Sequence, residues 1–156
     1  MKSKISLPEL KQQAFTYCTE FVWDRINRLQ QQIKEVVHAL TSETKSSAGD
    51  KHETGRAMLQ LEREKLGAQL AEAEQMQALL KKALSAKPHK TIGLGSLVIT
   101  NKASYFIAIS AGQFTNKQKS FFCISPSTPI GKLLLGKQIG DTFQFNQNTS
   151  TILHIG

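Results

Sequence analysis

The N-terminal half of the fold is decided by the stretch VWDRINRLQQQIKEVVHAL, residues 22–40, in which apolar side chains recur at steps of four and three. This heptad spacing puts them on one stripe of a helix. A second helical run, from about Glu53 to Leu84, carries a matching stripe. The two stripes consist of Val22, Ile26, Leu29, Ile33, Val36 and Leu40, and of Leu59, Leu66, Leu70, Ala73 and Leu80.

The two stripes are related as they would be in an antiparallel hairpin, where facing positions add to a constant. The constant is 99 for four pairs, and it places the fold-back point close to Gly49-Asp50, within the turn-like residues 44–50. A parallel dimer or two helices of a globular bundle are the alternatives, and neither predicts a polar turn at this centre. Each helix would extend about 45 Å, at roughly 1.5 Å per residue. The facing pairs are Leu40 with Leu59, Ile33 with Leu66, Leu29 with Leu70, and Ile26 with Ala73.

Two acids, Asp50 and Glu53, stand three residues apart where the second helix is predicted to begin. This spacing is typical of a capping box, in which both side chains satisfy backbone amides of the first turn. Carboxylates projected from the end of a rod can also supply oxygen ligands to a divalent cation held mainly by another molecule. Both interpretations can hold together.

The pattern changes after residue 85 from helical periodicity to short β-prone runs between turn residues. We therefore expect an α+β chain, with an antiparallel coiled-coil hairpin at 1–85, its tip near 45–54, a linker at 86–90 and a small β-rich domain at 91–156. One short helix is expected in that domain, with Ser127 or Thr128 as N-cap, Pro129 as its first residue and Gly136 as its end. The predicted strands are 96–100, 104–110, 119–125, 142–145 and 150–155.

Positive charge is concentrated in the second half of the chain. Residues 1–85 hold 13 Lys and Arg against 11 acids, whereas residues 86–156 hold seven Lys and a single acid, Asp141. This imbalance indicates an anionic partner, which could be nucleic acid, a membrane surface or an acidic protein face. The basic start is not followed by an apolar stretch of signal-peptide or membrane-spanning length, so we expect a cytoplasmic protein without membrane contact. The sequence leaves the oligomeric state open, with a monomer as the default.

The residues that most often carry chemistry are scattered. Cys18 and Cys123 lie in separate apolar segments and are interpreted as buried thiols. The four His residues share no element at ligand spacing, and a domain whose only acid is Asp141 is poorly supplied for acid–base catalysis. We therefore expect no active site of its own.

The segment CISPSTPIGKLLLGKQIGD, residues 123–141, resembles the signature of the Gre transcript-cleavage factors of bacterial RNA polymerase. In that family a strand leads to Ser-Pro-Ile, a small helix, then Gly-Lys and Gly-Asp. Residues 95–99 and 105–109 occupy the places of the family's earlier strands, and Gly49-Asp50 followed by Glu53 resembles the family's tip sequence. The tip also departs from the family, because Thr54 replaces an Asn, Gly55 and Arg56 replace an Ala and an acid, and Ala57 replaces an aromatic residue.

The resemblance implies an FKBP-like C-terminal domain that docks at the rim of the polymerase secondary channel while the hairpin enters it. Asp50 and Glu53 would then contact a Mg²⁺ ion shared with the polymerase active site, with no tightly bound cofactor. The polymerase itself would hydrolyse the backtracked RNA transcript, so this chain would stimulate an enzyme without being one. The docking residues implied by the same segment are Ser127, Pro129, Ile130, Lys132, Gly136, Lys137, Gly140 and Asp141.

Three other functions stay open. The first is a Gre-like regulator that enters the same channel without stimulating cleavage. The second is a peptidyl-prolyl isomerase, suggested only by the implied fold, which is a poor guide to function. The third is a basic nucleic-acid-binding protein, for which the adjacent aromatics at 105–106 and 121–122 are the nearest approach to a stacking platform.

Overall fold

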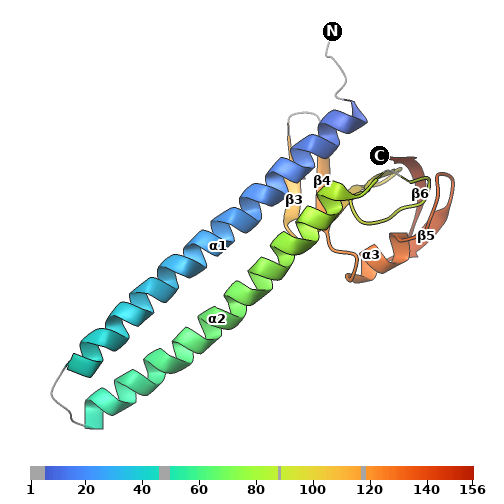
Figure 1. The fold of residues 1–156 in the computed structure, drawn as a ribbon. Helices are drawn as coiled ribbons and strands as arrows, with labels where there is room; N and C mark the ends of the chain where they lie inside the picture. Colours follow the sequence, from blue (N-terminus) through green and yellow to red (C-terminus); the bar gives the residue numbers. More distant parts are fainter. Residues whose placement is uncertain (1–5, 46–49, 88, 117–118) are drawn as a thin grey trace. The chain divides into compact units, whose positions relative to one another are not determined.

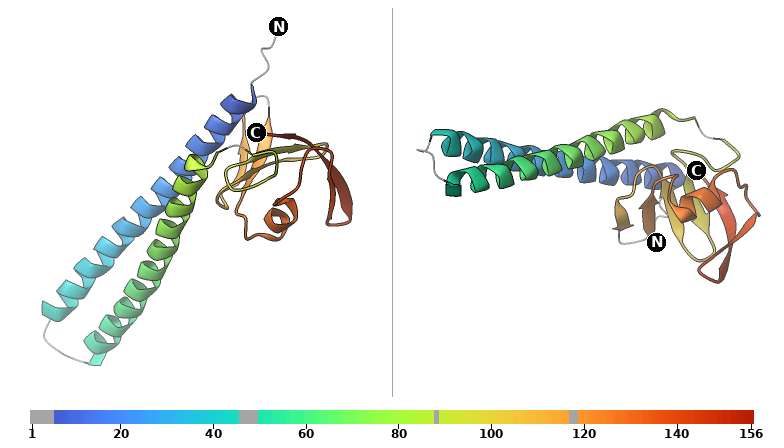
Figure 2. Two further views of the ribbon diagram at one scale, coloured as in Figure 1. Left: turned by 45° about the vertical axis from the view of Figure 1, so that its right-hand side comes forward. Right: turned by 90° about the horizontal axis from the view of Figure 1, so that it is seen from below.

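The computed structural model describes residues 6–45, 50–87, 89–116 and 119–156, without the side chains of residues 44–45 and 50–52. Two long helices, α1 (Leu7–Lys45) and α2 (Asp50–Ser85), lie side by side as a hairpin (Figures 1 and 2). They are followed by a six-stranded sheet and one short helix. The predicted α+β class and the hairpin are confirmed. The chain forms two compact units, one of Val22–Met76 and one of Met1–Phe21 with Gln77–Gly156.

The Val22–Met76 unit is held together by the predicted apolar seam. Leu29, Leu66 and Ala73 are buried in one cluster, and further seam residues pack against them. The pairings that place Leu29 near Leu70 and Ile33 near Leu66 therefore fall in a single core. The residues packed against the buried three are Ile26, Ile33, Val36 and Leu70.

The sheet is mixed, with the strand order β3-β4-β2-β1-β6-β5. Only β2 (Ser104–Ile107) and β4 (Ser120–Ile124) pair in parallel, and every other neighbouring pair is antiparallel. In the parallel pair, Tyr105 faces Phe122 and Phe106 faces Cys123. The remaining strands are β1 (Leu97–Thr100), β3 (Gly112–Thr115), β5 (Thr142–Phe145) and β6 (Asn148–Ile155).

Five of these strands were predicted, but β3 was not, and the expectation of five strands is therefore wrong. β3 is a short edge strand paired only with β4, and its side chains are largely exposed. Exposure on both faces removes the alternation by which a strand is recognised. β6 also begins two residues earlier than expected, because Asn146 and Gln147 adopt positive φ angles of 50° and 65°. This conformation is typical of a tight two-residue hairpin turn, and it continues the pairing of β5 with β6 up to the turn.

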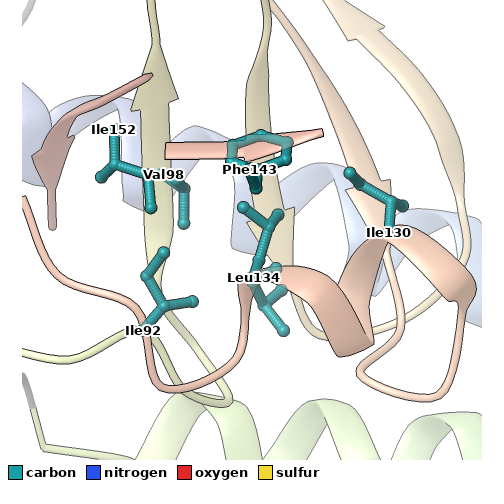
Figure 3. Packing of buried hydrophobic residues seen from close by; sticks show 7 residues of the cluster. Ile92, Val98, Ile130, Leu134, Phe143 and Ile152 are labelled. Atoms are coloured by element: carbon teal, nitrogen blue, oxygen red, sulfur yellow. The ribbon is translucent and has the colours of Figure 1, made fainter. Parts of the chain in front are cut away.

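One face of the sheet is covered by the short helix α3 (Pro129–Leu134), whose Ile130 and Leu134 point into the core (Figure 3). They meet Phe143 of β5 together with residues from the central strands. The buried cluster consists of Ile92, Val98, Ile107, Ile130, Leu134, Phe143 and Ile152.

Alternate residues of a strand point to opposite faces of the sheet. The face opposite α3 is covered by the first turns of α1. The Phe15 and Phe106 rings pack edge to face with centroids 4.9 Å apart. The Tyr17 hydroxyl donates a hydrogen bond of 2.8 Å to the carbonyl of Ala111. The beginning of α1 therefore belongs to the core of the β-rich unit. Within the described residues, no helix is both long and apolar enough to span a bilayer.

Candidate functional site

The predicted tip lies at the connection between α1 and α2. α1 ends at Lys45 and α2 begins at Asp50. Residues 46–49 of the predicted turn lie outside the described residues. Asp50 is the first residue of α2, and Glu53 follows in the same turn with an exposed side chain. The side chain of Asp50 lies outside the description, so its roles as a cap and as a metal ligand stay predictions.

A third carboxylate, that of Glu43, lies near this end of the hairpin and was missed in the sequence. Its carboxyl carbon is 4.0 Å from where a Cβ on Gly55 would lie, so Glu43 on α1 faces the second turn of α2. The constant sum of 99 pairs position 43 with position 56, which is next to Gly55. The closeness of Glu43 to this part of α2 could therefore have been predicted from the sequence. Among the described residues, no group of three His, Cys, Asp or Glu side chains is placed to hold a metal ion.

The predicted docking segment is built around the capped start of α3. The Thr128 hydroxyl oxygen accepts a hydrogen bond of 3.1 Å from the Gly131 amide, and Pro129 occupies the first turn. The same hydroxyl donates to the Ser125 carbonyl at 2.7 Å. The sequence prediction of this helix start is confirmed, with Thr128 as the N-cap.

Several motif residues serve the fold. Ile130 is only 8% exposed and belongs to the core cluster. Gly136 and Gly140 have φ angles of 83° and 93°, and their amides donate to the carbonyls of Ile92 and Ile152 at 2.8 Å. These φ angles favour glycine. Asp141 accepts a 2.8 Å hydrogen bond from the Gln138 amide and so closes the turn before β5.

Other members of the segment are presented to solvent. Ser127, Pro129 and Lys132 are exposed, and Lys137 is half-buried. Three apolar residues are exposed beside them, and none of the three was predicted to make contacts. They are Leu133, Leu135 and Ile139. Ile139 is 60% exposed.

Ile139 also lines an open groove of about 530 Å³ on the β-rich unit. Lys90 and His89 provide a basic side to this groove, while Ile139 and Ile155 provide an apolar one. The other described residue that lines the groove is Gln138. A basic and apolar groove of this kind suits contact with an acidic protein surface.

Burial shifts the pKa of several groups in the β-rich unit, Tyr105 and Lys11 among them. It raises the pKa of the Tyr105 phenol, which lies beside Phe122 with ring centroids 6.0 Å apart. It lowers the pKa of Lys11 on α1. Neither group lines the groove.

In comparisons with protein families and with curated proteins, no family model and no curated protein matches this chain.

Proposed function

We propose that this chain is a Gre-like transcription elongation factor that binds RNA polymerase at its secondary channel and promotes cleavage of backtracked RNA. The observation that carries the proposal is the place of the tip acids. α2 begins at Asp50, so Asp50 and Glu53 lie in its first turn, directly after the connection between two long packed helices. The Gre-like segment 123–141, in a separate part of the sequence, points to the same family.

Hydrolysis would take place in the polymerase, which supplies its own metal-binding residues. Asp50 and Glu53 would add carboxylate oxygens around a shared Mg²⁺ ion, whose chemistry is to activate water and stabilise the charge that develops on the phosphate. Glu53 is exposed and therefore available to such an ion. The hairpin would supply reach, and the chain would have no catalytic site of its own.

Docking would use the exposed part of the C-terminal motif. Pro129 and Lys132 of α3 are exposed, and the groove beside Ile139 brings basic and apolar side chains together. Residues 86–156 carry seven Lys against one acid, which favours an acidic surface on the polymerase. Close apolar contact at Ile139 would then add affinity to the charge attraction.

A regulator that occupies the channel without stimulating cleavage is the second candidate, and the departures at the tip favour it. Arg56 replaces a family acid and is exposed three residues after Glu53. Positions three apart are neighbours on a helix, so this cation would partly neutralise the carboxylate that should face the ion.

Both candidates are tested by a transcript-cleavage assay on stalled, backtracked complexes of the cognate polymerase. Asp50→Asn and Glu53→Gln keep residues suited to their places in a capping box but remove the charges. We expect cleavage to fall by about two orders of magnitude in each variant, with nearly constant polymerase affinity. Glu62→Gln, an exposed acid farther along α2, is the matched control and should cleave like the parent.

Three results would have different meanings. Loss of cleavage in the tip variants alone supports metal delivery. Full cleavage by both amide variants means that the acids act only as caps. A parent chain that competes for the channel without stimulating cleavage favours the regulator.

A further inference from the structure

The two cysteines of the chain, which are far apart in sequence, meet in the core of the β-rich unit. Cys18 lies on α1 and Cys123 on β4, and their side chains are 0% and 2% exposed. Both are free thiols, and a side-chain hydrogen bond joins them. The expectation of two buried thiols is confirmed, but their contact was not foreseen.

Contacts on both sides of Cys18 hold it against Cys123. Phe15, one helical turn earlier, packs on Phe106, and Phe106 is the register partner of Cys123. Tyr17, on the other side, donates to the Ala111 carbonyl at 2.8 Å, and the Ala111 amide donates to the Cys123 carbonyl at 3.2 Å. The thiol pair is therefore fixed by its neighbours.

From this juxtaposition we propose that Cys18 and Cys123 form an intramolecular disulfide under oxidising conditions, which would act as a redox switch tying the first turns of α1 to β4. A disulfide requires the two Cβ atoms to lie about 3.8 Å apart, and the contacts on both sides of Cys18 hold this part of α1 against Cys123. The crosslink would depend only on this packing and not on the proposed role in transcription.

A peroxide is the class of oxidant that the reaction needs. One sulfur, as its thiolate, attacks a peroxide oxygen, the O–O bond breaks, and a sulfenic acid and water result after protonation. The second sulfur then attacks the sulfenic sulfur, so the S–O bond breaks, the S–S bond forms and a second water leaves. The two thiols lose two electrons in total, and hydrogen peroxide is reduced to two water molecules.

The same burial that brings the thiols together also restrains the reaction. The hydrogen bond with Cys123, followed by burial, raises the pKa of the Cys18 thiol, so little of the reactive thiolate is present near neutral pH. An oxidant must reach the pair through transient opening of the α1 contact. The switch would therefore respond to sustained oxidation, and a reducing thiol buffer would reset it.

The test uses the full chain, first reduced and then treated with hydrogen peroxide. After remaining thiols are alkylated under denaturing conditions, non-reducing peptide mapping should find Cys18 linked to Cys123 in monomeric protein. The link should disappear on treatment with dithiothreitol. The oxidised chain should melt about 5 °C or more above the reduced chain, because the crosslink closes a long loop.

Cys18→Ala and Cys123→Ala are the matched controls, since each retains a small apolar side chain and one thiol. Neither should gain thermal stability on oxidation. Mapping of the parent chain decides the question even if a variant folds poorly. Full alkylation of both thiols, separate over-oxidation of each, or disulfides only between chains would overturn the proposal.

Discussion

Gly131 lies where α3 passes closest to the turn before it. A Cβ at this position would lie 2.3 Å from the Ser125 carbonyl oxygen and 3.1 Å from the Cα of Pro126. Because both atoms belong to the backbone, side-chain rotation cannot relieve the overlap. We expect Gly131→Ala to lower the free energy of unfolding by about 2–3 kcal/mol in urea denaturation.

Gly93→Ala is the control for this substitution, because a Cβ there would meet nothing within 4 Å. Its effect should stay within about 0.5 kcal/mol. Equal stability of the two variants would show that the turn before α3 can move, contrary to our interpretation of Gly131.

Single residues could be predicted where a local rule fixes them. Thr128, Pro129 and Gly136 mark the start and end of α3 because capping depends on near neighbours in sequence. The contact of Cys18 with Cys123 depends on the docking of a helix against a distant strand, for which a single sequence has no local signal. The exposure of Leu133 and Leu135 was also not foreseen. A helix of one and a half turns buries only a narrow stripe, so these two apolar side chains stay exposed.

At the scale of elements, the cap of α3 can be measured separately. Thr128→Ala removes the oxygen that accepts from the Gly131 amide, so we expect a loss of about 1 kcal/mol in the free energy of unfolding. Thr128→Ser retains that oxygen and should recover most of the loss. If both variants lose the same stability, the methyl group of Thr128 contributes the stabilisation and the cap does not.

The hairpin depends on its seam, and α2 offers a matched pair of leucines to test this. Leu66 is 4% exposed in the seam, whereas Leu61 is 65% exposed on the outer face. We expect Leu66→Ala to cost about 2–4 kcal/mol and Leu61→Ala less than about 0.5 kcal/mol. Loss of helical circular dichroism on heating is the measurement, and similar midpoints for the two variants would contradict the seam.

The hairpin was predictable because the sequence positions of facing residues in its two apolar stripes add to a constant. This relation needs no information from outside the helices. The order of the sheet was not predictable in the same way. β2 and β4 pair in parallel although β3 lies between them in sequence, and this arrangement depends on the complete fold. The exposed edge strand β3 leaves no alternating pattern to recognise.

At the scale of the whole molecule, binding and chemistry are proposed to lie in separate parts of the chain. The net charge of +8 comes mainly from residues 86–156, whereas the tip acids lie in α2. Binding to the polymerase should therefore weaken as salt is added, because exposed charges are screened. The steepness of that dependence should fall when a docking lysine is removed.

This separation predicts how two kinds of variant respond to protein concentration. Lys132→Glu reverses an exposed charge on α3, so it should raise by about tenfold the concentration needed for half-maximal cleavage, yet reach the parent's rate at saturation. Glu53→Gln should bind at the parent's concentration and never reach its rate, because no excess of protein replaces a missing ligand. Lys102→Glu, the same reversal at an exposed position between β1 and β2, should resemble the parent in both respects. If saturation also restores Glu53→Gln, the acid contributes to affinity and the tip has no direct part in the chemistry.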